Sequence, residues 1–190
     1  FEFYTGKRPC QPDNLDLQQM RTKLRTDMDE CEQTMAGCNG QFLREFLSGS
    51  HHEFLQTQAY PIRAQGVNPS AEPLQPHEVA KLLQEPGIED SLLESYTIWL
   101  KFLGLRLVDK ETGQLARTER GFDARTRNIR QNPHNLLRVS RVMQWLSEFH
   151  MEHYSESFLL CLLAERKAYG WTVSPTGRAS AFADSVMRYY

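Results

Sequence analysis

The chain has 190 residues, of which 40% are hydrophobic and 11% aromatic, and its formal charge is −2 at pH 7. This composition predicts a folded domain with a sizeable core and excludes a disordered tail. A slightly acidic chain is not a general nucleic-acid binder, although a local basic site is compatible with it. The longest apolar run, Phe158 to Ala164, is too short to cross a bilayer, so we expect no membrane insertion.

The first predicted element is a long helix over residues 14–37, which ends at Gly37. Its apolar residues recur every three or four positions and form a narrow stripe: Leu17, Met20, Leu24, Met28, Cys31 and Met35. A thin stripe favours a helix lying on the surface of the core over a coiled-coil seam. A shorter helix is expected at residues 41–47.

A proline-rich connector at residues 60–76 follows, with four prolines and little periodicity. It predicts either an ordered loop that wraps the domain or a divider between two parts. In the second case, an N-terminal helical subdomain would cover residues 1–58 and the main helical core residues 77–190. We expect residues 1–190 to form a single helical domain, excised from a longer protein.

Two helices and a hairpin are predicted next. The first helix begins at Pro76 and ends at Pro86-Gly87. The second covers residues 88–103 and is apolar over half its circumference, which predicts burial between neighbours. At residues 105–117 two short apolar runs flank a turn rich in Asp, Lys, Thr and Gly, a pattern that predicts a β-hairpin.

The C-terminal part is predicted to be helical. After a short helix or turn at residues 122–131, Asn132-Pro133 begins a helix that runs to residue 150. Residues 158–164 are apolar on every side, which predicts the most buried helix of the domain. A last helix is expected from Ser174. The predicted fold class is therefore all-α, an irregular multi-helix domain of six to eight helices with one small β-hairpin.

Sequence patterns of enzymes and metal sites are missing. The chain has no P-loop, no dinucleotide-binding glycine fingerprint, no HExxH and no GxSxG motif. His150 and His153 have zinc-ligand spacing, but they straddle a predicted helix junction without further ligands nearby. The four cysteines form no CxxC pair, which favours free thiols in a reducing compartment. We predict a protein that is not an enzyme and has no cofactor and no bound metal.

An arginine cluster is the most unusual feature. It holds seven arginines against one glutamate and one aspartate: Arg117, Arg120, Arg125, Arg127, Arg130, Arg138 and Arg141. Arginine makes planar, bidentate contacts with carboxylate or phosphate, and a helix begins within the cluster, where anions are favoured. We predict a solvent-facing ligand- or anion-binding surface formed by Arg125, Arg127, His134, Arg138, Arg141 and Trp145. The alternative is that these arginines pair internally with the acidic first helix, and that Arg141 stacks on Trp145.

Two stretches, "FLGLRLVDKETGQLAR" (residues 102–117) and "RTRNIRQNPHNLLRVSRVMQWLSEFHMEHYSESFLLCLLAE" (residues 125–165), resemble the conserved N-terminal region of the opioid growth factor receptor family. Residues 52–56 and 60–62 resemble earlier blocks of that family. The run "QTQAYP" at residues 56–61 lacks the tryptophan usual there, which indicates a divergent or receptor-like member.

The resemblance implies an intracellular binding domain, located in the cytoplasm, around the nucleus and within it. It also implies a receptor for Met-enkephalin or a similar opioid-like peptide, with a role in growth regulation. A site for such a peptide needs an apolar surface together with an acid and an arginine. The alternative is a nucleic-acid- or phosphate-binding scaffold, or a protein-interaction scaffold, that uses the arginine cluster.

Overall fold

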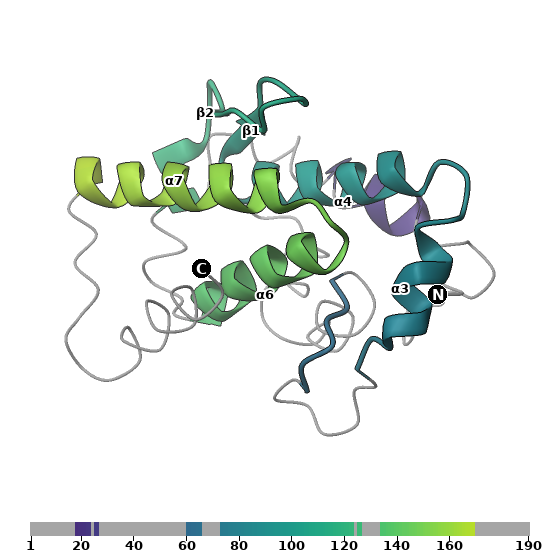
Figure 1. Ribbon diagram of the computed structural model, residues 1–190. Helices are drawn as coiled ribbons and strands as arrows, with labels where there is room; N and C mark the ends of the chain where they lie inside the picture. The colour runs from purple at the N-terminus through teal and green to yellow at the C-terminus, as the bar shows by residue number, and fades with distance from the viewer. Residues whose placement is uncertain are drawn as a thin grey trace.

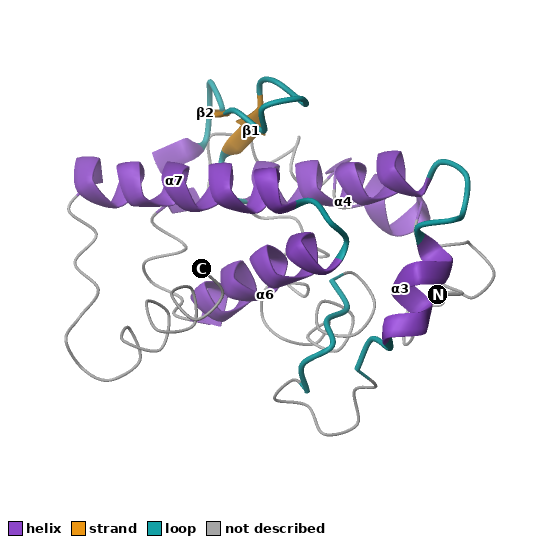
Figure 2. Cartoon of the chain, in the orientation of Figure 1, coloured by secondary structure: helices purple, strands orange, loops and turns teal. Residues whose placement is uncertain are grey.

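The computed structural model of the chain describes residues 18–23, 25–26, 60–65, 73–123, 125–126 and 134–169. Its labelled elements are α3 (Pro76–Leu82), α4 (Ile88–Phe102), β1 (Leu105–Leu107), β2 (Leu115–Arg117), α6 (His134–Glu148) and α7 (Glu152–Tyr169). Residues 18–23 and 25–26 are also helical, and residues 122–126 include a short helical turn. Figures 1 and 2 show that helices make up most of the described chain.

The mainly helical class with one antiparallel hairpin is confirmed. The described part of the chain holds five helices, fewer than the six to eight expected. The helices predicted at residues 41–47 and from Ser174 lie outside the described residues. No helix in the described part combines the length and the apolar character that a membrane span requires.

Helix α4 forms the centre of the core. Its residues Leu92, Tyr96 and Leu100 are 0% exposed, and Trp99 is 2% exposed. Acidic Glu89 and Asp90 in the first turn and Lys101 in the last complement the helix dipole. The apolar side chains described on α6 and in the turn after it are buried: Val139, Val142, Met143, Leu146 and Phe149.

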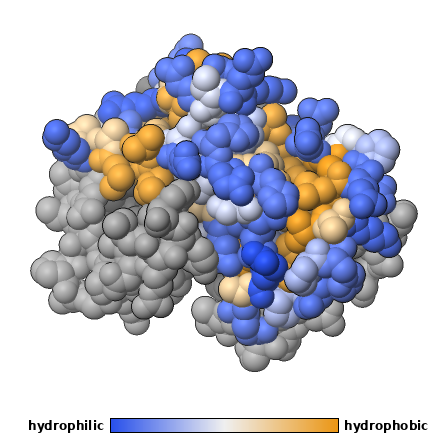
Figure 3. Space-filling view, viewed as in Figure 1, coloured by the Kyte–Doolittle hydropathy of each residue, from blue (hydrophilic) through white to orange (hydrophobic). Residues whose placement is uncertain are grey.

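Helix α7 packs against α6 on one side and against β2 on the other. The prediction that residues 158–164 form the most buried helix segment is wrong. Phe158 is 0% exposed, but Leu160 and Leu163 are 66% and 48% exposed, and apolar surface is visible on the α7 side of the molecule in Figure 3. An apolar pattern on all sides predicts burial on all sides, whereas α7 lies at the edge of the fold.

A tight connection joins α6 to α7. His150 has φ +58°, the amide of Met151 donates to the Leu146 carbonyl at 2.9 Å, and the amide of His150 donates to the Ser147 carbonyl at 3.2 Å. This is the Schellman pattern of helix termination, with histidine in the left-handed position. It confirms the helix junction predicted at this point and folds α7 back onto α6.

The hairpin is confirmed with the register Leu105↔Arg117, Arg106↔Ala116 and Leu107↔Leu115. The Asp109 carboxylate organises its turn by accepting hydrogen bonds from the Glu111 amide and the Thr112 hydroxyl, both at 2.8 Å. The Tyr154 hydroxyl donates to the Lys110 carbonyl at 2.7 Å, which fixes the turn on α7.

Among the glycines in the described part of the chain, Gly104, between α4 and β1, is the one at which substitution is expected to cost most. Its φ is +77°, and an added Cβ would lie 2.9 Å from the Phe122 Cα. Gly104→Ala therefore adds a backbone clash to left-handed strain, and we expect a loss of roughly 2–4 kcal/mol in the free energy of unfolding. Urea denaturation measures this loss.

The matched control is Gly87→Ala. Gly87 has φ +76°, but an added Cβ there has nothing within 4 Å. This variant should lose only the strain energy, about 1–2 kcal/mol. Equal losses in the two variants would show that the close approach of Phe122 contributes nothing.

Candidate functional site

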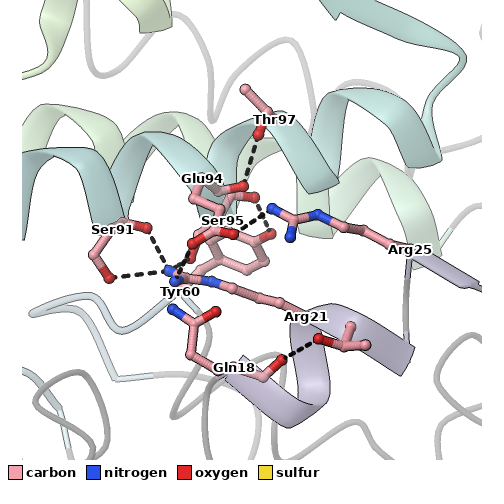
Figure 4. A network of polar contacts seen from close by, with 9 residues as sticks. Gln18, Arg21, Arg25, Tyr60, Ser91, Glu94, Ser95 and Thr97 are labelled. Atoms are coloured by element: carbon pink, nitrogen blue, oxygen red, sulfur yellow. Dashed lines mark hydrogen bonds and ion pairs between the residues drawn. The ribbon is translucent and has the colours of Figure 1, made fainter.

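The segment of residues 60–63 lies packed against α4 and α6. Tyr60 and Ile62 are 5% and 7% exposed. The Tyr60 ring makes edge-to-face contacts with two indoles, at centroid distances of 5.1 Å to Trp145 and 6.0 Å to Trp99. Its hydroxyl donates to the Ser95 carbonyl at 3.0 Å, a contact visible in Figure 4. One tyrosine is thus enclosed by aromatic rings from two helices and is hydrogen-bonded at its far end.

Two charged side chains of α6 bind the main chain of this segment. Arg141 Nε donates to the Tyr60 carbonyl at 2.8 Å. The Glu148 carboxylate accepts from the Arg63 amide at 3.0 and 3.1 Å, and from Arg63 Nε at 3.0 Å. Positions 141, 145 and 148 follow helical spacing, so Arg141, Trp145 and Glu148 share one stripe of α6. We call Ser95, Trp99, Arg141, Trp145 and Glu148 the α4–α6 site.

Burial sets the electrostatics of the α4–α6 site. It lowers the pKa of Arg141 to about 10, while the nearby charge of Glu148 acts in the opposite direction. Burial also lowers the pKa of Arg138. Arg141 stays protonated at neutral pH, so it presents a partly desolvated cation that favours an oxygen acceptor. The Glu148 side chain is 4% exposed and provides the matching anion.

The two indoles of the α4–α6 site retain unused donors. The Nε1 atoms of Trp99 and Trp145 are buried, and neither has a hydrogen-bond partner among the described residues. Buried indole N–H groups usually find an acceptor, and leaving one without it costs free energy. The segment of residues 60–63 therefore does not use all the hydrogen-bonding capacity around it.

The predicted surface of six residues is only partly brought together. Arg141 and Trp145 lie side by side in the α4–α6 site, and Arg138 is half-buried one turn earlier on α6. Arg125 is 5% exposed and lies beside Gly104, at the base of the hairpin. His134 is the first residue of α6, and its side chain is not among those described; Arg127 lies outside the described residues.

The expectation that this surface faces solvent is wrong for Trp145, which is 0% exposed, and for Arg125. The segment of residues 60–63 covers that side of α6, and the periodicity of α6 alone does not reveal such a distant contact. Ligand binding by the predicted residues stays a prediction.

Arg117, like Arg141, is a member of the arginine cluster that binds another part of the same chain. Its Nε and Nη2 atoms donate to the Glu165 carboxylate of α7 at 2.9 and 2.8 Å, and its guanidinium lies 4.7 Å above the Phe122 ring. The alternative interpretation, internal pairing, therefore holds for Arg117, although its partner is α7 and not the first helix. Arg120 is exposed.

A buried arginine in the first helical segment joins that segment to α4. Arg21 is 2% exposed and donates to Glu94 Oε2 at 2.6 Å, to Ser95 Oγ at 2.7 Å and to the Ser91 carbonyl. Arg25 binds the other oxygen of the same carboxylate, as Figure 4 shows. The neighbouring Met20 is 1% exposed, which confirms one member of the predicted methionine-rich stripe; the other members lie outside the described residues.

Sequence reasoning missed Tyr60, Glu148 and Arg21 as functional or structural residues. A signal existed for Glu148, because it follows Arg141 by seven positions and so shares its helix face. Tyr60 stands before a proline, a context that predicts extended backbone but no particular partner. For Arg21 the sequence carries no comparable signal.

The described residues contain no cluster of three or more histidine, cysteine, aspartate or glutamate side chains that could hold a metal ion. At the surface, His150 Nδ1 lies 4.0 Å from Glu152 Oε1. Cys161 is a free thiol, and burial raises its pKa to about 11, so it is not a reactive thiolate. The other three cysteines lie outside the described residues, and the predicted absence of a metal stays a prediction.

Fold and site together define a mainly helical domain that holds a non-helical segment of its own chain between aromatic and charged side chains. The chain belongs to the opioid growth factor receptor family, because the family's sequence model, described as the opioid growth factor receptor (OGFr) conserved region, matches residues 1–169. This confirms the resemblance. No solved structure was found to match the chain.

Individual relatives agree with this assignment. The chain is 32% identical to the mouse opioid growth factor receptor over 119 residues, which is 63% of this chain and 18% of that protein. It is 30% identical to the human receptor over 136 residues, 67% of this chain and 20% of that protein. Identity to mouse opioid growth factor receptor-like protein 1 is 26% over 163 residues, 86% of this chain and 31% of that protein. The chain thus spans less than a third of the length of these relatives.

Proposed function

We propose that this chain is a non-enzymatic binding domain that recognises an opioid-like peptide inside the cell and thereby takes part in growth regulation. Membership of the opioid growth factor receptor family supports a receptor-like role. The observation that carries the peptide part is the way in which the α4–α6 site holds residues 60–63. A segment of the chain itself is already bound there through its main chain and one aromatic side chain.

The chemistry of the α4–α6 site suits an opioid-like peptide. Such a ligand offers aromatic rings, an amine and a carboxylate. The site offers the indoles of Trp99 and Trp145, the carboxylate of Glu148 and the guanidinium of Arg141. These are the apolar surface, the acid and the arginine that the ligand requires.

The arginine cluster gives less support to the alternative, a nucleic-acid or phosphate scaffold. Arg117 is paired with Glu165, Arg125 is buried, and Arg141 binds a main-chain carbonyl. Phosphate binding needs arginines that are free to reach the ligand. Among the described members of the cluster, Arg117 and Arg120 are exposed, and Arg117 is already bound to Glu165.

Isothermal titration of the chain with Met-enkephalin, with a scrambled pentapeptide and with a short single-stranded RNA tests this proposal. We expect saturable binding of Met-enkephalin, weaker binding of the scrambled peptide, and little change between two salt concentrations. RNA binding that falls steeply with salt would instead favour the scaffold. Arg120→Ala is the control, because loss of this exposed arginine should leave peptide affinity unchanged. Absence of Met-enkephalin binding would refute the opioid ligand.

A further inference from the structure

We infer that the chain regulates its own peptide site: residues 60–63 occupy the α4–α6 site in place of a ligand, and a linear peptide of similar chemistry competes with them. This inference rests on the proposed peptide-binding function and adds to it the ligand pattern and a built-in competitor. The matching ligand carries a tyrosine, an apolar residue two positions later and a cation three positions after the tyrosine.

The first support is the kind of contact that holds the segment. Arg141 binds a main-chain carbonyl, and Glu148 binds a main-chain amide. Contacts of this kind are available to any extended peptide that enters in the same direction, since every peptide has the same backbone groups. The sequence-specific contacts are the Tyr60 ring and hydroxyl, the buried Ile62 side chain and the ion pair of Arg63 with Glu148.

The second support is the unused hydrogen-bonding capacity. Both indole N–H groups of the site are buried without a partner among the described residues. A ligand that brings an acceptor to either of them gains a hydrogen bond that the internal segment does not make there. An external peptide that reaches either group with an acceptor therefore has a possible advantage in hydrogen bonding over the internal segment.

The third support is the exposed end of the segment. The Arg63 side chain is 59% exposed although its partner Glu148 is buried. Solvent reaches the cationic end of the segment, so an external cation can approach Glu148 from that side. Displacement can begin at Arg63 before the Tyr60 ring leaves the indoles.

A tethered competitor lowers the apparent affinity for an external peptide. The apparent dissociation constant equals the intrinsic constant divided by the fraction of molecules whose site is vacant. Weakening the internal segment raises this fraction, so affinity for the external peptide should rise. A variant that merely damages the fold would lower it.

The test is a titration with acetyl-Tyr-Pro-Ile-Arg-amide, which reproduces residues 60–63. Arg63→Ala removes the ion pair at the exposed end without opening a cavity, and the peptide should then bind about two- to fivefold more tightly than to the wild type. The matched control is Arg106→Ala, an exposed arginine on β1, which should bind like the wild type. Unchanged or weaker binding to Arg63→Ala, or no binding to either protein at millimolar peptide, overturns the inference.

Tyr60→Ala provides a second arm. If this variant folds, the tetrapeptide should bind it and raise its melting temperature, while an alanine-substituted peptide, acetyl-Ala-Pro-Ile-Arg-amide, should not. If the Tyr60→Ala protein folds but does not bind the tetrapeptide, Tyr60 is an ordinary core residue. This result also overturns the inference. If Tyr60→Ala does not fold, the Arg63→Ala result decides alone.

A parallel titration with Met-enkephalin separates this inference from the proposed function. Met-enkephalin binding that is equal in the wild type and in Arg63→Ala would keep the proposed function and refute the internal competitor. Tighter tetrapeptide binding to Arg63→Ala without any Met-enkephalin binding would keep the competitor and refute the opioid ligand.

Discussion

Trp145→Ala is expected to lower the free energy of unfolding by about 3–5 kcal/mol. The indole is 0% exposed, and its ring packs against Tyr60 at 5.1 Å and Phe149 at 5.9 Å. Alanine leaves a cavity between α6 and the segment of residues 60–63, because the surrounding side chains relax only partly. Equilibrium denaturation followed by circular dichroism measures the loss.

Leu160→Ala on α7 is the control for Trp145→Ala. Leu160 is 66% exposed, so its truncation should change stability by no more than about 0.5 kcal/mol. If Trp145→Ala cost as little as Leu160→Ala, the indole would be at the surface in solution. The solvent-facing position expected for Trp145 from the sequence would then be right.

Arg21→Ala is expected to cost roughly 2–4 kcal/mol, because it removes one partner of a largely buried polar network. Without the guanidinium, the Ser91 carbonyl and the Ser95 hydroxyl lose this donor, and the Glu94 carboxylate keeps Arg25 and Gln18. The same loss loosens the attachment of Met20, which is 1% exposed, to the core.

Arg25→Ala is the matched control for Arg21→Ala. Arg25 pairs with the same carboxylate, but its side chain is 44% exposed, compared with 3% for Arg21. An exposed ion pair contributes about 0–1 kcal/mol, so this variant should stay close to the wild type. Equal losses would contradict the view that burial makes Arg21 the dominant partner.

The network also predicts a pH dependence. Burial raises the pKa of Glu94, but the hydrogen bond from Arg25 and the charges of Arg21 and Arg25 outweigh it, and the pKa lies below its ordinary value of 4.5. A carboxyl group with a lowered folded-state pKa stabilises the fold above its unfolded-state pKa. It loses that contribution as the pH falls through the folded value. The deficit of Arg21→Ala should therefore be full at neutral pH and shrink in acid, whereas Glu94→Gln should lack this titration.

Local signals predicted most of the element boundaries. Pro76 begins α3, Gly87 precedes α4, and Gly104 separates α4 from β1 with a positive φ that suits glycine. The change of apolar period at residues 105–117 predicted the hairpin. These features depend on a few neighbouring residues, so the sequence carries the information directly.

The α4–α6 site could not be predicted in the same way. Arg141 and Tyr60 are 81 positions apart, and Arg63 and Glu148 are 85 apart. The sequence predicted the helix α6 but placed the flank that carries Trp145 in solvent. Only the return of a distant segment shows that this flank is also covered.

Helix α7 and the first helical segment also depart from what their own sequences predict, in opposite directions: one is more exposed than expected and the other more buried. The apolar run of α7 predicted burial, yet Leu160 and Leu163 reach the surface. The thin apolar stripe of the first helix predicted a helix on the surface of the core, yet Arg21 is buried beside Met20. The hydrophobic pattern of a helix shows which of its faces can be buried. The elements packed against the helix determine which faces are buried.

The position of Tyr60 gives the protein an optical property. Two of the chain's three tryptophans lie beside this ring, at centroid distances of 5.1 and 6.0 Å, and the third, Trp171, is outside the described residues. At such separations, excitation of Tyr60 passes to the indoles by resonance transfer, and its own ultraviolet emission is quenched. Departure of Tyr60 from between the two indoles weakens this transfer and changes the polarity that the indoles sense. Unlabelled protein therefore carries an intrinsic fluorescent reporter of whether residue 60 is in place.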